Sequence, residues 1–305
     1  MTRVGALGRR TRLAVLGSPI AHSKSPALHG AAYRELGLDW TYEAVDVTAA
    51  GLPDFLASRD GTWRGVSLTM PLKRDVLPLL ATRDDIVDLA GAANTVLLGD
   101  EGLAGFNTDV VGITSALRAS GITGVLRVRL LGAGATAASV LVAIAQLGAT
   151  HVLVSTRSPG TAAHLLPLAA MLGLDLAVGP LAGAVAGHRG DPGADPGADP
   201  AARPTALFAP DLVVSTLPGG AAIDLEFPAD VRRSATLFDV AYDPWPSALA
   251  TSWYAVDGLV VPGIEMLVGQ ALSQVRVFVT GSTHTPVERE DAVLAAMRVS
   301  VGLAP

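Results

Sequence analysis

Two lysines stand out in this chain because arginine supplies almost all of its positive charge. The 305 residues include 22 Lys and Arg together, of which only Lys24 and Lys73 are lysine. A buried lysine ammonium can lose its proton near neutral pH, whereas an arginine guanidinium in a protein stays charged. Lys73 closes the segment Gly65-Val-Ser-Leu-Thr-Met-Pro-Leu-Lys73. A lysine at this position, in a chain that otherwise uses arginine, indicates proton transfer rather than simple charge. An ordinary surface lysine is the alternative.

Asp109 is the carboxylate that we expect to pair with Lys73. It ends the segment Gly105-Phe-Asn-Thr-Asp109, and Asn94-Thr95 is a second polar pair beside an apolar run. A Lys/Asp pair beside a secondary alcohol can pass a proton while a nicotinamide takes the hydride. The alternative is that Asp109 only caps the helix that we expect to begin near Val110.

A glycine-rich turn joins a predicted strand to a predicted helix in the second half of the chain. The strand covers 127–131, and the turn reads Gly132-Ala-Gly-Ala-Thr-Ala137. In this context the glycines permit a tight turn, and the helix N-terminus offers unpaired N–H groups to a diphosphate. Ala137 replaces the third glycine of the common fingerprint, which the pattern allows. The turn therefore favours a dinucleotide site over a glycine turn without a ligand.

The end of the next predicted strand, 151–155, indicates which dinucleotide binds. NAD sites usually place an acidic residue there, on the ribose hydroxyls. This chain has Ser155-Thr-Arg-Ser158 instead, with no Asp or Glu. Arg157 can pair with a 2′-phosphate, helped by the hydroxyls of Thr156 and Ser158. The segment favours NADP, and an ordinary surface arginine is the alternative.

Two serines near the N-terminus form a candidate anion site. Ser23 and Ser25 lie two residues apart, just before a predicted helix whose first turn contains Pro26. Hydroxyls and helix-end N–H groups together can bind a small anion. Ser25 serving only as the helix N-cap is the alternative.

Short apolar or β-branched runs alternate with Ala- and Leu-rich stretches along most of the chain. This alternation predicts βαβ units and parallel sheets, and hence an α/β fold. The predicted strands are 13–16, 42–47, 65–69, 94–98, 127–131, 151–155, 212–216 and 236–240. The predicted helices are 26–36, 51–58, 86–91, 135–148, 263–280 and 288–301.

Composition is typical of a compact globular protein. Half of the residues are hydrophobic and 16% are charged, and 305 residues suffice for two domains. The net charge of −6, without a basic stripe, argues against a nucleic-acid partner. No apolar run has the length of a signal peptide or a membrane span, and the six His residues show no metal-ligand spacing. The chain has no Cys, which fits a reducing cytoplasm.

Residues 187–204 differ from the rest of the chain in composition, because Asp-Pro-Gly-Ala is repeated at Asp191 and Asp195. A segment so rich in Pro, Gly and Asp buries little apolar area, so we expect a solvated, poorly ordered loop. A linker between domains is the alternative, but predicted strands of one sheet lie on both sides of the segment.

Seven motifs of this chain, taken in order, resemble those of the shikimate dehydrogenase family, from about Leu13 to Gly281. The motifs are Gly17-Ser-Pro-Ile-Ala-His-Ser-Lys-Ser-Pro26, Ser67-Leu-Thr-Met-Pro-Leu-Lys73, Gly91-Ala-Ala-Asn-Thr95, Gly105-Phe-Asn-Thr-Asp109, Ser215-Thr-Leu-Pro218, Asp239-Val-Ala-Tyr-Asp-Pro244 and Gly263-Ile-Glu-Met-Leu-Val-Gly-Gln270. One such motif carries little weight, whereas seven in the same order are specific.

The resemblance implies an enzyme that reduces 3-dehydroshikimate to shikimate with NADPH, in the pathway to chorismate and the aromatic amino acids. It implies Lys73 as the acid/base and Asp109 as its partner on the reacting hydroxyl. The implied substrate contacts are Ser23, Ser25 and Tyr242 for the carboxylate, and Thr69, Asn94 and Gln270 for the ring hydroxyls or the groups that hold them. The implied cofactor contacts are Gly132, Ala133, Gly134, Ala135, Thr136, Thr156, Arg157 and Ser158, with Asp85, Val240 and Gly263 as assignments that can equally be structural.

The resemblance also implies the domain organisation. An N-terminal α/β substrate domain would cover 1–112, and a Rossmann-type NADP-binding domain would cover 113–263, including the segment 187–204. Helices within 264–305 would return to the first domain. The active site would lie in a cleft between the domains. A monomer and a homodimer are both compatible with this organisation.

Three departures from the family motifs bear on affinity and substrate choice. Ser67 stands where the family usually has Asn, Gly30 where Asn commonly follows His, and Thr156 where Asn usually precedes the cofactor Arg. One alternative is a paralogue that acts on quinate or an aminated shikimate analogue, with NADP or NAD. Another is a catalytically silent NADP-binding regulator, against which the presence of both Lys73 and Asp109 argues.

Overall fold

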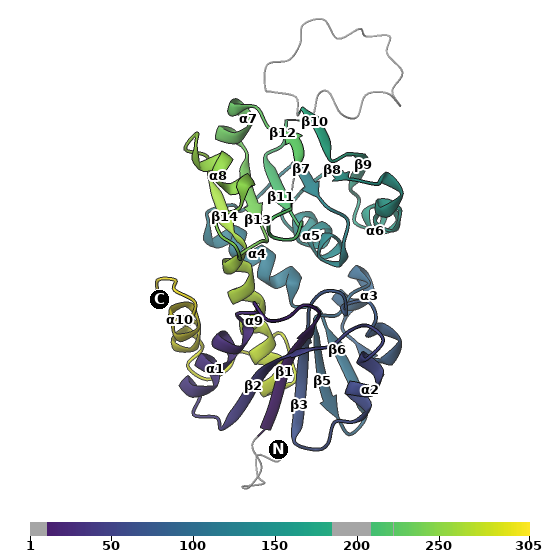
Figure 1. Cartoon of the computed structure of the whole chain (residues 1–305), viewed down its shortest axis with the longest axis vertical. Helices are drawn as coiled ribbons and strands as arrows, with labels where there is room; N and C mark the ends of the chain where they lie inside the picture. Colours follow the sequence, from purple (N-terminus) through teal and green to yellow (C-terminus); the bar gives the residue numbers. More distant parts are fainter. Residues whose placement is uncertain (1–10, 185–208, 222) are drawn as a thin grey trace, which may run out of the picture. The chain divides into compact units, whose positions relative to one another are not determined.

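The computed structural model describes residues 11–184, 209–221 and 223–305. The segment 187–204, for which we expect a solvated loop, lies outside the described residues. The chain divides into two units, one made of Met1–Gly112 and Leu267–Pro305 and the other of Ile113–Met266. A six-stranded sheet forms the centre of each unit (Figure 1).

The first unit contains a mixed sheet rather than the parallel sheet that the sequence predicted. Its strand order is β2-β1-β3-β5-β6-β4. β1 (Thr11–Gly17) runs parallel to both β2 (Trp40–Asp46) and β3 (Trp63–Leu68). β5 (Thr95–Gly99) runs antiparallel to β3 and to β6 (Gly102–Phe106), which in turn pairs with β4 (Thr82–Arg83).

The hairpin of β5 and β6 explains why the prediction of a parallel sheet was wrong here. Gly99 pairs with Gly102, so that only two residues connect the strands. A parallel pair needs a crossover of about a dozen residues or more, whereas two residues suffice for a hairpin. Gly102 has a φ of 110°, a backbone conformation that favours glycine.

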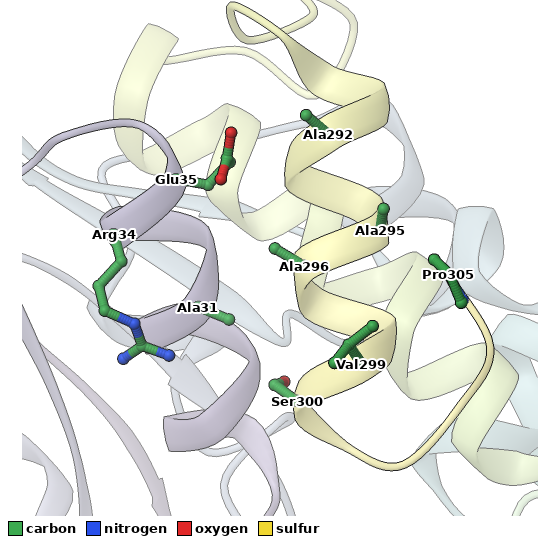
Figure 2. A pocket seen from close by; sticks show the side chains of 9 residues that line it. All are labelled: Ala31, Arg34, Glu35, Ala292, Ala295, Ala296, Val299, Ser300 and Pro305. Atoms are coloured by element: carbon green, nitrogen blue, oxygen red, sulfur yellow. The ribbon is translucent and has the colours of Figure 1, made fainter.

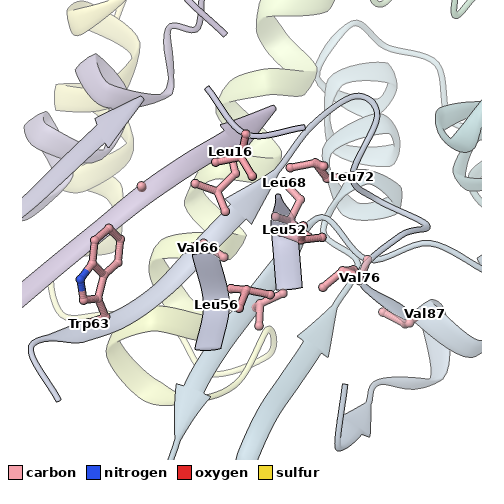
Figure 3. Close-up of a cluster of buried hydrophobic side chains, with 13 residues drawn as sticks. Leu16, Leu52, Leu56, Trp63, Val66, Leu68, Leu72, Val76 and Val87 are labelled. Atoms are coloured by element: carbon pink, nitrogen blue, oxygen red, sulfur yellow. The ribbon is translucent and has the colours of Figure 1, made fainter. Parts of the chain in front are cut away.

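Helices cover both faces of the first sheet. On one face, Leu52 and Leu56 of α2 (Leu52–Ala57) belong to a buried apolar cluster with Leu16, Val66 and Leu68 of the strands (Figure 3). Side chains alternate between the two faces along each strand, so Ser67 points to the other face. The helices of this unit are α1 (Ser25–Glu35), α2, the short η1 (Leu77–Leu79), α3 (Asp85–Ala90), α10 (Glu290–Ser300), the start of α4 (Asp109–Ala119) and most of α9 (Gly263–Thr280).

A glycine on β3 lets α9 approach the sheet closely. A Cβ atom at Gly65 would lie 2.5 Å from Cε1 of Phe278 on α9 and 2.6 Å from the carbonyl oxygen of Val96. Gln270 and Gln274 precede Phe278 by eight and four residues on the same helix, so all three lie along one helix face. The glycine therefore helps to bring two glutamines of α9 to the sheet.

The second unit contains six parallel strands in the order β14-β13-β11-β7-β8-β9. Read from β9, this is the 3-2-1-4-5-6 order typical of dinucleotide-binding domains, and it confirms the prediction of a parallel sheet for this unit. The predicted strands are present as β7 (Arg127–Leu131), β8 (His151–Thr156), β11 (Leu212–Ser215) and β13 (Thr236–Asp239).

Several short elements of the second unit were not predicted. They are the helices η2 (Pro159–Leu165), α6 (Leu166–Met171), α7 (Ala229–Ser234) and α8 (Ala248–Tyr254), and the strands β9 (Asp175–Pro180), β10 (Ala182–Ala184), β12 (Asp224–Glu226) and β14 (Val260–Pro262). α5 (Ala135–Gln146), which was predicted, connects β7 to β8. Within 11–184, 209–221 and 223–305, no helix combines the length and apolarity that a membrane span requires.

Candidate active site

One edge of the first sheet collects the polar motifs. At this edge β3 ends, β5 begins and β6 ends, because β5 runs antiparallel to both of its neighbours. Lys73 follows β3, Asn94 immediately precedes β5, and Asp109 follows β6 as the first residue of α4. The mixed sheet, which the sequence analysis missed, therefore brings these three residues together.

Lys73 and Asp109 form a short ion pair. Lys73 Nζ donates to Asp109 Oδ2 at 2.6 Å. The side chain of Asp109 is completely buried, whereas that of Lys73 is 11% exposed. A carboxylate that is buried needs a partner, and the ammonium group provides one while it still reaches the surface. The pair can hold a proton at Nζ beside a bound ligand.

Asn94 holds the second oxygen of this carboxylate. Its Oδ1 accepts from the backbone N–H of Thr108 at 2.9 Å, which fixes the orientation of the amide group. Its Nδ2 therefore faces Asp109 Oδ1 at 2.8 Å, and also lies 3.2 Å from Gln270 Oε1 on α9. Asn94 is 1% exposed, so its contacts are with the protein rather than with solvent. These contacts hold Asp109 and Gln270 in fixed orientations.

Asn107 is a residue of the site that the sequence analysis did not identify. Its Oδ1 accepts from the backbone N–H of Asp109 at 3.0 Å, and its Nδ2 donates to the carbonyl of Ala92 at 2.9 Å. Its own N–H donates to Asp84 Oδ2 at 3.2 Å. Burial of Asp84 raises the pKa of that carboxyl above its usual value. An Asn two residues before the expected carboxylate was the available signal in the sequence.

The three hydroxyl residues expected to contact the substrate, Ser23, Ser25 and Thr69, differ in their hydrogen bonds within the protein. Ser23 Oγ accepts from the backbone N–H of Ser25 at 3.3 Å. The hydroxyls of Ser25 and Thr69 make no hydrogen bond to any residue that the structure describes, and both are therefore available to a ligand. The alternative that Ser25 is an N-cap is wrong: α1 begins at Ser25, and Lys24 occupies the cap position without a side-chain hydrogen bond.

The glycine turn of the second unit has the geometry of a diphosphate cradle. Gly132 has a φ of 100°, and a Cβ there would lie 2.6 Å from Thr216 Oγ1, so the position requires glycine. Gly134 caps α5 without a side-chain hydrogen bond, which leaves the first N–H groups of the helix open. Ala133, Ala135 and Thr136 complete the turn. These features fit a bound dinucleotide.

The turn after β8 presents Arg157. Thr156 is 6% exposed, and its Oγ1 accepts from the N–H of Ser158 at 3.2 Å and lies 2.9 Å from Thr161 Oγ1. The Thr156 hydroxyl therefore shapes the turn. Arg157 is exposed, and its guanidinium pairs with no carboxylate of the described residues. Gly132 N donates to Ser155 O at 2.9 Å, so this turn lies beside the glycine turn.

Four further expected residues lie in different places. Asp85 is exposed in the first turn of α3, in the first unit. Val240 and Gly263 of the second unit touch through their backbones, because a Cβ at Gly263 would overlap the Val240 carbonyl. Tyr242 is half-buried in the second unit, and burial raises the pKa of its hydroxyl, which keeps the group neutral.

A groove of about 580 Å³ lies on other elements, between α1 and α10 (Figure 2). Its lining includes Ala31 and Arg34 of α1 and Ala292, Ala296 and Val299 of α10. None of its lining residues belongs to the Lys73–Asp109 site. Across the part of the chain that the structure describes, no group of three or more His, Asp or Glu side chains is arranged to hold a metal ion.

Comparisons with known proteins agree over most of the chain. A family model described as the shikimate dehydrogenase substrate binding domain matches residues 15–96. The shikimate dehydrogenase (NADP(+)) of Rubrobacter xylanophilus is 33% identical, over 88% of this chain and 90% of that protein. The crystal structure of the Mycobacterium tuberculosis shikimate dehydrogenase is 35% identical, covers 95% of this chain and 99% of that one, and has a TM-score of 0.73. The Thermus thermophilus enzyme in complex with NADP(H) and shikimate is 31% identical with the same coverage and a TM-score of 0.73.

Proposed function

Since this chain belongs to the shikimate dehydrogenase family, we propose that Lys73 and Asp109 carry the proton transfer in the NADPH-dependent, reversible reduction of 3-dehydroshikimate to shikimate. The observation that supports these roles is the 2.6 Å contact between Lys73 Nζ and the fully buried carboxylate of Asp109. It places one transferable proton at the edge of a polar cluster that also contains Asn94 and Gln270.

The proton transfer follows from this geometry. NADPH, when bound, supplies the hydride to the carbonyl carbon of the substrate. As negative charge develops on the substrate oxygen, Lys73 Nζ donates a proton to it, and in the oxidation of shikimate the same nitrogen takes the proton back. Asp109 aims Nζ through its Oδ2, while Asn94 keeps the carboxylate from turning.

Hydroxyl and amide side chains would bind the substrate. Ser25 at the start of α1 and Ser23 two residues before it, with Tyr242, would bind the substrate carboxylate. The free hydroxyl of Thr69 and the side chain of Gln270 would bind ring hydroxyls. Asn94 would act mainly by holding Asp109 and Gln270, because its amide is already engaged by both.

The cofactor contacts are proposed on the second unit. The N–H groups of the turn from Gly132 to Thr136 would hold the diphosphate, and the exposed Arg157, with the Ser158 hydroxyl, would hold the 2′-phosphate. The division of the chain at Gly112/Ile113 and Met266/Leu267 supports a substrate domain of 1–112 with 264–305 and a cofactor domain of 113–263. Asp85, Val240 and Gly263 are not needed for these contacts.

We further propose a cytoplasmic enzyme that works as a monomer or a homodimer without a nucleic-acid partner. The net charge of −6 supports the last point, because phosphate backbones repel an acidic protein. Sedimentation of the purified protein decides between monomer and dimer, and a gel-shift assay at low salt tests nucleic-acid binding.

Nicotinamide absorbance with four substrate pairings tests the function. Shikimate and quinate are each combined with NADP and NAD. Fast reduction with shikimate and NADP, and slow reduction with the other pairings, is the expected result. Efficient turnover of quinate, or with NAD, would instead assign the chain to a paralogue with another preference. NADP binding without turnover on any pairing would contradict the proposed catalysis.

A further inference from the structure

Three buried polar side chains behind the active site are not explained by the roles given above. Tyr33 and His29 lie on α1 and Gln274 lies on α9, and they are 1%, 0% and 4% exposed. Buried polar groups are retained at a cost unless they are hydrogen-bonded. The contacts of these three residues therefore indicate what they are for.

The three side chains form one continuous chain of hydrogen bonds. His29 Nδ1 lies 3.1 Å from the Tyr33 hydroxyl, and His29 Nε2 lies 3.1 Å from Gln274 Oε1. Gln274 Nε2 donates to the backbone carbonyl of Asn94 at 3.5 Å. The His29 ring also stacks on the ring of Tyr42, with centroids 3.9 Å apart and planes at 3°, which fixes its orientation.

The hydrogen bonds of this series can be donated in only one direction. A carbonyl can only accept, so Gln274 turns its NH₂ group to Asn94 and its Oε1 to His29. His29 Nε2 must then carry the hydrogen. Burial lowers the pKa of His29 to about 3, so the ring is neutral and its Nδ1 is an acceptor. Tyr33 therefore donates to Nδ1, and the order is Tyr33 to His29 to Gln274 to Asn94.

This series of hydrogen bonds ends at Asn94, the residue that contacts the Asp109 carboxylate. The backbone carbonyl of Asn94 accepts a hydrogen bond from Gln274 Nε2. The side-chain Nδ2 of Asn94 donates to Asp109 Oδ1 at 2.8 Å and lies 3.2 Å from Gln270 Oε1. Gln270 and Gln274 are one turn apart on α9, and both contact Asn94. The two glutamines therefore fix the position of α9 relative to Asn94. A change at Gln274 therefore reaches Asp109 through a single residue.

We propose that Tyr33, His29 and Gln274 form a relay of fixed hydrogen-bond direction that positions Asn94, and through it Asp109 and Gln270, for the reaction. The three are positioning residues, since none of them touches the Lys73–Asp109 pair directly. The positioning role rests on the proposed function, whereas the direction of the relay does not. A relay that only stabilised the fold would affect unfolding but not the catalytic step.

Two substitutions of Gln274 separate these possibilities. Gln274→Met fills a similar volume but neither donates nor accepts. Gln274→Glu as a carboxylate accepts from His29 but faces the Asn94 carbonyl with a second acceptor, whereas its protonated form restores both contacts. Val277→Ala on α9, at a fully buried position, is the control for lost packing. The measurements are kcat and KM for shikimate and NADP from pH 6 to pH 9.

The relay predicts a specific pattern. Gln274→Met should lower kcat by about threefold to tenfold, the scale of one neutral hydrogen bond, with little change in KM for NADP. Gln274→Glu should lose at least about tenfold at pH 9 and recover toward low pH, relative to wild type at each pH. The other titratable groups near this position are His29 and Tyr33 of α1, Tyr42 of β2, and Lys73 with Asp109, and all are present in the wild-type reference. Losses no larger than in Val277→Ala, or a wild-type pH profile for Gln274→Glu, would overturn the positioning role.

Nitrogen NMR tests the relay without any turnover. In ¹⁵N-histidine-labelled protein, the ring signals missing from His29→Gln belong to His29. They should show a neutral ring with the hydrogen on Nε2 from pH 7 down to pH 4.5. A hydrogen on Nδ1, or titration near pH 6.5, would overturn the proposed direction.

The side-chain amide signal of Asn94 supplies a second readout that needs no activity. Assigned by its loss in Asn94→Ala, it should shift in Gln274→Met and stay in place in Val277→Ala. An unshifted signal in both variants would overturn the positioning of Asn94. If the wild-type protein turned over no shikimate, the proposed function would fail, while these two signals would still decide on the relay.

Discussion

The side-chain carbonyl of Asn107 accepts a hydrogen bond from the backbone N–H of Asp109 at 3.0 Å. Asn107 is 2% exposed, and its amide group is anchored on the carbonyl of Ala92 at 2.9 Å. The first residue of α4 is thus tied to the segment that precedes β5. Since the Asp109 carboxylate contacts Lys73, the position of the proposed proton donor depends on Asn107, which is itself almost fully buried.

Asn107→Ala should lower kcat by roughly one to two decades, because Asp109 loses its backbone anchor and two buried hydrogen bonds are broken. The free energy of unfolding should fall by about 2–3 kcal/mol. Initial rates and urea unfolding measure the two effects. Arg64→Met is the control, since it removes a hydrogen bond to the Phe278 carbonyl in the same unit without touching the site. Equal kcat losses in both variants would show that Asn107 acts only through stability.

Arg157→Ala should weaken the binding of NADP by about tenfold to a hundredfold and that of NAD very little, because only NADP carries a 2′-phosphate for the guanidinium. Fluorescence titration with both cofactors measures the ratio of the two dissociation constants. Arg233→Ala, an exposed arginine in the last turn of α7, is the matched control for net charge. Equal weakening of both cofactors would remove Arg157 from the 2′-phosphate site.

His29 makes stability depend on pH in a defined direction. Its folded pKa is lowered from 6.5 to about 3 by burial, so below pH 6.5 the unfolded chain binds a proton that the folded chain does not. The free energy of unfolding is therefore highest above pH 6.5, where His29 is neutral in both states. It falls by about 1.4 kcal/mol per pH unit as the pH drops from 6.5 toward 3. Urea unfolding of wild type and His29→Gln between pH 7 and pH 4 should give a shallower slope for the variant. Parallel slopes would mean that His29 is protonated in the folded state.

Gly65→Ala tests the close approach of α9. The added Cβ would meet the Phe278 ring and the Val96 carbonyl, both closer than normal contact, and should lower the free energy of unfolding by about 1–3 kcal/mol. Gly61→Ala is the control, because a Cβ there has no neighbour within 4 Å. Equal stability of the two variants in urea would show that α9 can shift at no cost.

Local sequence patterns predicted the parts of the fold that depend on neighbouring residues. The strand 127–131, its glycine turn and the helix 263–280 agree with the structure at both ends, because the apolar period and the glycines act within a few residues. β6 was missed, since its run Gly102–Phe106 is short and contains two glycines. Without β6 and the hairpin that it forms with β5, the sequence predicted a parallel sheet where the structure has a mixed one.

Contacts between distant segments were not predictable in the same way. The residue types of Lys73 and Asp109 were enough to predict that they form a pair. The contact between His29 and Gln274 was not predicted, because these residues are 245 positions apart. Their contact depends on the register of α9 against α1, which no local pattern contains. Ser25 was misassigned as a possible N-cap because α1 begins one residue earlier than predicted. An error of one residue at a helix end is enough to change the role of a side chain.

Turnover of Lys73→Ala with shikimate and NADP is the most direct test of Lys73 as the proton donor. Lys73→Arg is the matched variant, because it keeps the positive charge beside Asp109 but cannot release a proton. Both variants should fold as wild type and lose roughly two to four decades in kcat, while NADP binding stays unchanged. A kcat close to that of wild type in either variant would contradict proton transfer by Lys73.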